Sequence, residues 1–188
     1  RYADRTRVTP MGAVQPNSSV VVEGEIRICD VVFSRKRSLV CRLQDGTGKI
    51  TLRFYHFSNA QKQRLSIGTR IRCYGEARPG ASGLEIYHPE YEFVNQKTPP
   101  PLAQNLTPVY PTTEGLTQQR LRDLTDQALA LLDDGSLKEL IPPAIRQQLD
   151  QVSLASALRF LHRPPKGTSL VQLADGQHPY QQRLVFEE

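Results

Sequence analysis

Several features that would place this chain in a special class of protein are missing or scarce. Cysteine occurs only three times in 188 residues, which excludes a small scaffold held by disulfides. No apolar run approaches the roughly 18 residues that a membrane span needs. The chain opens on Arg1 with no charged and then apolar leader, and we interpret it as an internal piece of a longer protein. With 38% hydrophobic residues, wholesale disorder is not expected.

Reactive side chains do not cluster at the spacings of a metal or catalytic site either. Cys29, Cys41 and Cys73 each lie in an apolar stretch typical of a strand, and we predict buried, reduced thiols of a cytosolic protein. Cysteine and histidine do not recur at metal-binding intervals, so no metal site is predicted. We find no carboxylate pair beside a histidine and expect no catalytic residue. His88 and His162, both next to proline, are interpreted as packing or hydrogen-bonding residues.

One short string imitates a nucleotide-binding motif. Residues 46–50 read Gly-Thr-Gly-Lys-Ile, like the end of a phosphate-binding loop. That loop needs an earlier glycine and a Ser or Thr after the lysine, and Ile50 stands in the latter place. Asp45 and the two glycines instead predict a tight hairpin turn.

Positive charge is concentrated in the first half of the chain. The formal net charge is +5 and the isoelectric point about 9.3. Residues 1–95 carry a net charge of +6, whereas residues 96–188 carry −1. Residues 27–78 hold 12 basic and 3 acidic side chains. Such a density favours a polyanionic partner for the first half.

A proline-rich stretch divides the sequence where the charge changes. Prolines at 99–101, 108 and 111 favour an extended linker, because they lack amide donors. We therefore predict a domain at residues 1–97, a linker at 98–112 and a helical segment at 113–188.

The first domain has the two-residue periodicity of strands. Five strands and a short helix between the third and fourth are typical of an OB-type Greek-key barrel; an immunoglobulin-like sandwich is the alternative. The fold class is therefore mainly β with α, a five-stranded barrel followed by a small helical segment. The strands are predicted at 20–29, 39–44, 49–57, 69–77 and 84–94, and the helix at 59–65.

The second half has helical periodicity. A helix beginning near residues 112–117 carries Leu121, Leu124, Ala128 and Leu131 on one stripe and stops at Asp133-Asp134-Gly135. Further helices are predicted at 142–151, at 153–161 and from 179 onward. We expect a small packing unit without reactive groups.

Alternation in the third strand points to a binding face. Ile50, Leu52 and Phe54 form one face, and Thr51, Arg53, Tyr55 and Phe57 the other. Exposed rings beside cations are how OB barrels hold single-stranded nucleic acid, since bases stack on the rings and cations follow the phosphates. We therefore predict that Tyr55, Phe57 and Phe54 stack on bases, with His56 as a secondary candidate.

The neighbouring strand and loop extend this prediction. In the fourth strand Ile71 and Cys73 should face inward, while Tyr74, a secondary stacking candidate, faces outward. Contacts to phosphates carry no base specificity, so we expect binding that is independent of sequence. The predicted phosphate contacts are Arg35, Lys36, Arg37, Arg42, Lys49, Arg53, Arg70 and Arg72.

Blocks of sequence along the whole chain carry a family resemblance. The most specific are Val-Tyr-Pro-Thr-Thr-Glu-Gly at 109–115 and His-Arg-Pro-Pro at 162–165. Together with the others, in this order, they resemble the RecG family of branched-DNA helicases. The others are residues 1–6, 45–57, 88–91, 106–116, 176–179, 183–184 and 187–188.

The resemblance implies a role and partners. In that family this region is the wedge, an OB barrel that precedes two RecA-like motor domains which use ATP and Mg²⁺. The wedge would split the arms of stalled forks and Holliday junctions during recombination and repair. The implied stacking segment is Arg53–Phe57, in which Tyr55 replaces a second Phe that is frequent in the family. Implied partners are branched DNA, the protein's own motor domains and a single-stranded-DNA-binding protein, in the bacterial cytoplasm at the nucleoid and away from membranes.

Two other functions fit an OB barrel. An anticodon-binding or general single-strand-binding module without helicase activity would prefer RNA or plain single strands to junctions. A protein-interaction module would be indifferent to nucleic acid.

Overall fold

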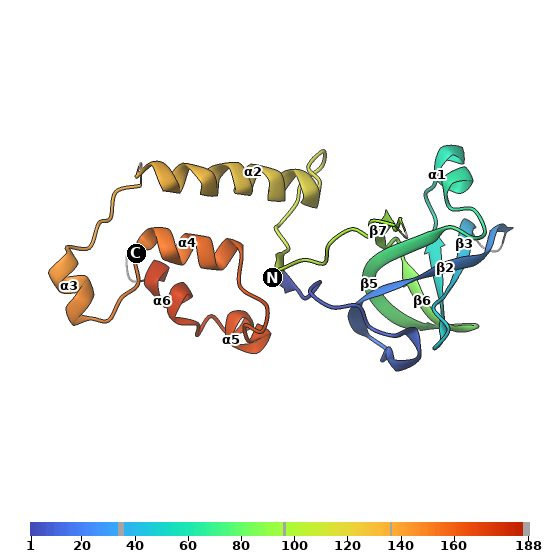
Figure 1. Cartoon of the computed structure of the whole chain (residues 1–188), viewed down its shortest axis with the longest axis horizontal. Coiled ribbons are helices and arrows are strands. Elements are labelled where there is room, and N and C mark those ends of the chain that lie inside the picture. Colours follow the sequence, from blue (N-terminus) through green and yellow to red (C-terminus); the bar gives the residue numbers. More distant parts are fainter. Residues whose placement is uncertain (34–35, 96, 136, 186–188) are drawn as a thin grey trace. The chain divides into compact units, whose positions relative to one another are not determined.

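The chain forms two units. The structure, a computed structural model, describes residues 1–33, 36–95, 97–135 and 137–185. The first unit, Arg5–Ala103, is mainly β; the second joins Arg1–Asp4 to the described residues from Gln104 onward and is mainly helical. Figure 1 labels the elements of both.

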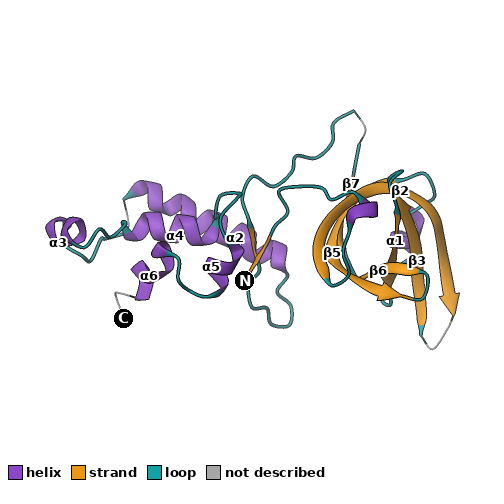
Figure 2. Cartoon of the chain, turned by 90° about the horizontal axis from the view of Figure 1, so that it is seen from below, coloured by secondary structure: helices purple, strands orange, loops and turns teal. Residues whose placement is uncertain are grey.

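The first unit is a closed barrel. Five strands follow the order β2-β3-β4-β6-β5, and β5 pairs back onto β2. The β4–β6 pair is parallel and the other pairs are antiparallel, as in an OB barrel. The predicted fold is confirmed, and Figure 2 shows the strands curving around a common interior. The strands are β2 (Ser18–Phe33), β3 (Arg37–Gln44), β4 (Lys49–Phe54), β5 (Arg70–Gly80) and β6 (Gly83–Tyr87), with β7 (Glu90–Phe93) added on β5.

Strands β2 and β5 run past their predicted ends, to Phe33 and Gly80, and two other predicted strands stop early or divide. The third was expected to reach Phe57, but β4 ends at Phe54 and a bend follows. The fifth was expected to run through residues 84–94, but it divides into β6 and β7 at His88, whose φ is 47°. Pro89 follows at the same corner and has no amide to give to a ladder. Both breaks lie at the same end of the barrel, because the His88 amide donates to the Arg53 carbonyl at 2.9 Å.

A bulge in β2 changes which side chains face inward. The pairing with β3 shifts between Ile26 and Ile28, so one extra residue enters β2 and the alternation reverses after it. Ile26 is fully buried, whereas Ile28, two residues further along the same strand, is 38% exposed. Cys29 takes the inward position and pairs directly with Cys41.

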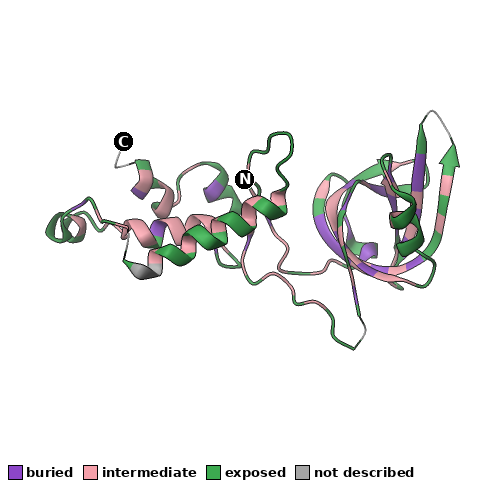
Figure 3. Cartoon of the chain, turned by 90° about the horizontal axis from the view of Figure 1, so that it is seen from above, coloured by how far each residue is buried: buried purple, intermediate pink, exposed green. Residues whose placement is uncertain are grey.

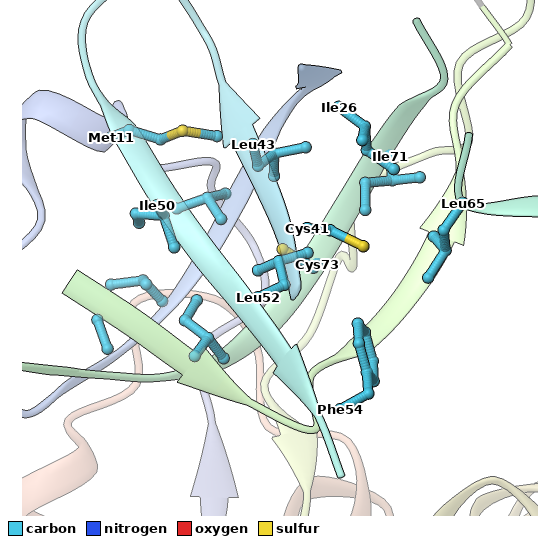
Figure 4. Packing of buried hydrophobic residues seen from close by; sticks show 14 of the residues in the cluster. Met11, Ile26, Cys41, Leu43, Ile50, Leu52, Phe54, Leu65, Ile71 and Cys73 are labelled. Carbon is cyan, nitrogen blue, oxygen red and sulfur yellow. The ribbon is translucent and has the colours of Figure 1, made fainter. Parts of the chain in front are cut away.

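The core fills the barrel with aliphatic side chains. Leu39, Leu43 and Leu52 are fully buried, and Figure 4 shows core side chains converging from several strands. Helix α1 (Asn59–Arg64) is followed by Leu65, which is also fully buried in this cluster. The helix therefore fixes the segment between β4 and β5 to the barrel.

The string that imitates a phosphate loop is a hairpin turn, as predicted. Gly46 has a φ of 89°, a conformation that glycine adopts without strain. The Asp45 carboxylate accepts hydrogen bonds from the amides of Thr47 and Gly48 at 2.8 and 3.0 Å, and from the amide of Met11 at 2.8 Å. Burial alone would raise the pKa of Asp45, but these bonds outweigh it and lower the pKa. The turn is thereby tied to the 3₁₀ helix η1 (Met11–Ala13).

The three thiols should differ in reactivity. Cys29 and Cys41 lie with their sulfurs 3.1 Å apart; a hydrogen bond from Cys41 lowers the pKa of the half-buried Cys29, while the pKa of Cys41 is raised. Burial raises the pKa of Cys73 to about 12. Since the thiolate is the nucleophile, brief treatment of the native chain with iodoacetamide near neutral pH should alkylate Cys29 first. Peptide mass mapping reports this, and equal labelling of Cys73 would contradict the assigned burial.

The second unit begins with a short sheet. Strand β1 (Tyr2–Ala3) pairs with β8 (Thr107–Pro108), and the Leu106 amide donates to the Pro164 carbonyl at 2.8 Å. Leu106 is 2% exposed. Part of the segment predicted as a linker at 98–112 is therefore packed, because alternate residues enter the helical unit.

The predicted helices are present, with bounds that differ by a few residues. Thr117 caps α2 by accepting from the Arg120 amide at 3.2 Å, and Gly135, with a φ of 66°, ends the following turn. Two short helices, η2 and α5, were not predicted. The bounds are α2 (Gln118–Ala130), η2 (Leu131–Asp134), α3 (Pro143–Gln148), α4 (Leu154–His162), α5 (Leu170–Ala174) and α6 (Pro179–Val185).

The apolar stripe of α2 is not a core face among the described residues. Leu124 and Leu131 are 50% and 60% exposed, and Figure 3 shows much of α2 in the colour of exposed residues. The buried part of this unit lies instead around Ala157 of α4 and Leu173 of α5. Glu139 links α6 to α3, since its carboxylate forms ion pairs with Arg183 of α6 and Arg146 of α3.

Candidate nucleic-acid interface

Four rings gather where β4 and β6 end. Tyr55 stacks on Tyr87 with centroids 6.0 Å apart and planes 11° apart. His88 lies 5.8 Å from Tyr55 and 5.9 Å from His56. Tyr55 is 38% exposed, and His56 and His88 are also exposed. We call Tyr55, His56, Tyr87 and His88 the ring cluster. It offers aromatic faces to solvent on a rigid support.

Backbone bonds set the position of the cluster. The Tyr55 amide donates to His88 Nε2 at 3.3 Å, and the positive φ of His88 turns the chain back over the end of β4. Phe54 lies beneath, in an edge contact with His88 at 6.2 Å. The bend after β4 and the corner after β6 therefore hold one another.

An ion pair between Arg53 and Glu85 holds Tyr87 in position. Arg53 donates Nε and Nη2 to the Glu85 carboxylate at 3.0 and 3.1 Å, and Nη1 to the Ser38 hydroxyl at 3.1 Å. Glu85 is 2% exposed, and its bond from Arg53 lowers the pKa of Glu85. The Tyr87 hydroxyl also bonds to Glu85, which raises the pKa of Tyr87. Arg53 was predicted to contact phosphate; its nitrogens are instead bonded to Glu85 and Ser38 on the face of the sheet opposite the core, where Arg53 positions Tyr87 through Glu85.

The other two predicted stacking residues are packed. Phe54 is 3% exposed and belongs to the core, so its ring has no face for a base, and this corrects its assignment. Phe57 lies beyond the strand, packs against the core cluster and carries the Arg37 guanidinium over its ring at 4.8 Å. Of the predicted set, Tyr55 and His56 present exposed rings.

The outer face of β5 is neutralised. Ile71 and Cys73 face inward as predicted, with at most 1% exposed. Arg70 and Arg72 both donate to Glu23, at 3.1 and 3.0 Å, and Arg72 also reaches Glu92 at 3.2 Å. Their predicted role as phosphate contacts is therefore not supported by their positions, because acidic partners occupy them.

Tyr74, the secondary stacking candidate on β5, is covered. The Arg5 guanidinium lies 4.0 Å from the centre of its ring. That guanidinium is held there by two hydrogen bonds of 2.8 Å to Glu90. The ring face is thus occupied by a side chain of the same unit.

The remaining predicted cations lie on β3 and its loops. Lys36, Arg37 and Lys49 are exposed and Arg42 is partly so. Within the described residues, neither Arg42 nor Lys49 makes an ion pair. Arg35 lies outside the described residues.

Sequence reasoning missed three members of the arrangement: Tyr87, Glu85 and His88. Tyr87 and Glu85 share the face of β6 opposite the fully buried Ile86, a signal that the alternation does contain. His88 was predicted to be a packing or hydrogen-bonding residue, and it does accept a hydrogen bond from the Tyr55 amide; its place in the ring cluster was not predicted, since nothing in its local sequence reveals the turn toward Tyr55.

Other chemistry is not apparent in the described part of the chain. No group of three or more histidine, cysteine or acidic side chains is placed to hold a metal ion. None of the described helices is long and apolar enough to cross a membrane.

Comparison with known proteins identifies the family. A family model for the RecG wedge domain matches residues 1–132. The chain belongs to the RecG wedge family. It is 47% identical to the ATP-dependent DNA helicase RecG of Escherichia coli K12 and 46% identical to that of Haemophilus influenzae, in each case over all of this chain and 27% of the relative.

A solved structure supports the RecG fold. The RecG chain bound to a three-way DNA junction matches all of this chain and 25% of that chain, with a TM-score of 0.70 and 21% sequence identity. At this sequence identity the match is evidence for the fold alone. The chain thus spans about a quarter of the length of its RecG relatives.

Proposed function

We propose that this chain is the wedge of an ATP-dependent DNA helicase that binds and remodels branched DNA. The observation that carries the proposal is the exposed ring cluster, held by Arg53 and Glu85 at one end of a RecG wedge barrel. A base unpaired at a fork would stack on Tyr55, which returns about 1–3 kcal/mol of the cost of unpairing. Lys36, Arg37, Arg42 and Lys49 would contact phosphates.

The same proposal covers the rest of the protein. The relatives are ATP-dependent helicases, so ATP with Mg²⁺ would act in motor domains outside this chain. Stalled forks and Holliday junctions would be the substrates, and a single-stranded-DNA-binding protein a further partner, in the bacterial cytoplasm at the nucleoid. Contacts to phosphates carry no base specificity, so binding should ignore sequence.

A competition experiment tests the proposal against the other OB functions. The full-length protein is bound to a labelled three-way DNA junction and challenged with unlabelled junction, single-stranded DNA and single-stranded RNA of equal length. We expect the junction to compete at least tenfold better than either single strand. A preference for RNA or for plain single strands would favour the anticodon-type module, and indifference to all three would favour a protein-interaction module.

A further inference from the structure

The end of β2 carries an aromatic residue in an unusual position. Beyond the bulge, Cys29, Val31 and Phe33 lie on one side of β2, opposite Cys41, Leu39 and Arg37 of β3. This is the core-facing side, since Cys41 and Leu39 are fully buried. Cys29 and Val31 are half-buried, and Phe33 is 78% exposed.

The exposure follows from the length of the strand. Strand β2 pairs with β5 only through Glu25, and β3 pairs with β4 only from Leu39 onward. The pairs Val32–Ser38 and Phe33–Arg37 therefore extend beyond the barrel, and we call residues 32–33 with 36–38 the β2–β3 arm. Figure 3 draws the end of β2 in the colour of exposed residues. Single exposed apolar side chains are common, so what matters is what lies beside this one.

Phe33 lies next to the predicted binding surface. It is directly opposite Arg37, and directly opposed side chains share a face. The Arg37 guanidinium in turn covers the ring of Phe57, which follows Tyr55 and His56 in the chain. Arg37 thus connects Phe33 to Phe57, which lies two residues beyond Tyr55 at the end of the barrel where β4 stops.

Charge around this face favours a polyanion. Lys36 and Arg37 are exposed at the arm, and Lys62 of α1 lies close enough to Cys29 to lower its pKa. Asp30 is the acidic group whose charge acts on the same thiol. Its side chain lies on the opposite side of β2, because neighbouring residues of a strand alternate in face. A ring among cations suits a nucleobase attached to phosphates better than it suits an acidic peptide, because each base offers a π-face.

We propose that Phe33 is a second stacking residue, which holds a base of the single strand that leaves the ring cluster along the β2–β3 arm. The inference rests on the proposed function and adds the path of the strand. Phe33 is two residues along β2 from Val31, and Val31 lies two strands away from Phe54, through Leu39. At about 3.3 Å per residue and about 4.8 Å per strand this is roughly 12 Å, or about three to four stacked nucleotides at about 3.4 Å each. Phe33 should therefore act only on strands longer than that.

Binding of the full-length protein to forks with single-stranded arms of different length tests the inference. Phe33→Ala should bind a fork with an arm of about ten nucleotides roughly tenfold more weakly than the unaltered protein, and should bind a fork with an arm of about one nucleotide equally well. Tyr55→Ala should weaken both. Ile67→Ala removes another exposed apolar side chain, 68% exposed, from the same barrel and should change neither.

Two further variants separate stacking from other contacts. Phe33→Tyr keeps the ring and should bind as the unaltered protein does, whereas Phe33→Leu should behave like Phe33→Ala. Full affinity of Phe33→Ala for the fork with the long arm, or full affinity of Phe33→Leu for that fork, would overturn the stacking role of Phe33. The proposed function would still stand if Tyr55→Ala bound forks more weakly. If Tyr55→Ala also bound normally, both proposals would fail.

Discussion

Replacing Glu85 by alanine should lower the free energy of unfolding of the barrel by about 3–5 kcal/mol, the usual cost of removing one partner of a buried ion pair. Glu85 is 2% exposed and accepts two hydrogen bonds from Arg53. Without the carboxylate, Arg53 keeps its charge in a site where its side chain is only 19% exposed. Hydrogen exchange of β4 and β6 amides in the 188-residue chain measures the loss, because exchange reports the opening of each part separately.

A matched variant controls for the substitution itself. Glu76 also pairs with an arginine, Arg78, but these side chains are 42% and 57% exposed. Exposed pairs contribute about 0–1 kcal/mol, so Glu76→Ala should change exchange little. Equal effects of Glu85→Ala and Glu76→Ala would show that the buried pair does not hold β4 to β6.

The effect of Glu85 should also depend on pH. Because the bond from Arg53 lowers the pKa of Glu85 in the folded chain, the stabilisation is present above the pKa of an unfolded glutamate, about 4.3. It is lost as the pH falls through the lower folded value. The unaltered chain and Glu85→Ala should therefore differ fully near neutral pH and converge in strong acid.

The barrel was predictable from local patterns. Alternation placed Ile50, Leu52 and Phe54 on one face, and all three are buried; Asp45 and the glycines beside it predicted the hairpin turn. The bulge before Ile28 could not be predicted from these patterns. One inserted residue moves every later side chain of the strand to the opposite face. The ends of β4 and β6 were missed for a similar reason: they depend on the contact between Tyr55 and His88, residues that are distant in sequence.

The charge count misled the prediction of phosphate contacts. Residues 27–78 have a large positive excess in sequence, yet the partners of Arg53, Arg70 and Arg72 lie just outside that range. Glu23 and Glu92 meet two of them on the sheet, and Glu85 meets the third. Pairing across strands brings such residues together, and a sequence window does not show it. Within the described residues, the cations of this range that remain outside such pairs include Arg37 and Arg42 of β3, Lys49 of β4 and Lys62 of α1.

Tyr55→Ala in the full-length protein should weaken fork binding by about 5- to 150-fold, the equivalent of about 1–3 kcal/mol for one stacked base. Tyr55 is the exposed member of the Tyr55–Tyr87 stack, so its removal takes away the face on which the split base would rest. Unwinding of a three-way junction should slow by a comparable factor, while ATP hydrolysis at saturating DNA is retained. Gel-shift titration and a strand-displacement assay measure the two effects.

Two variants serve as controls for this prediction. Tyr55→Phe keeps the ring and should retain binding. Tyr74→Ala makes the same truncation on the same barrel, at a ring already covered by Arg5, and should bind forks normally. A loss as large in Tyr74→Ala as in Tyr55→Ala would mean that general damage to the barrel, and not the loss of one stacking face, explains the defect.

Photo-crosslinking tests the role of the ring cluster most directly. A three-way junction with 5-iodouracil at the first unpaired base of the branch point is bound to the full-length protein, irradiated, and mapped by mass spectrometry. We expect a crosslink in the peptide that contains Tyr55, absent from Tyr55→Ala and from a junction with the label deep in a duplex arm. Crosslinks confined to the outer face of β5, around Arg70 and Arg72, would contradict the placement of the wedge surface at the ring cluster.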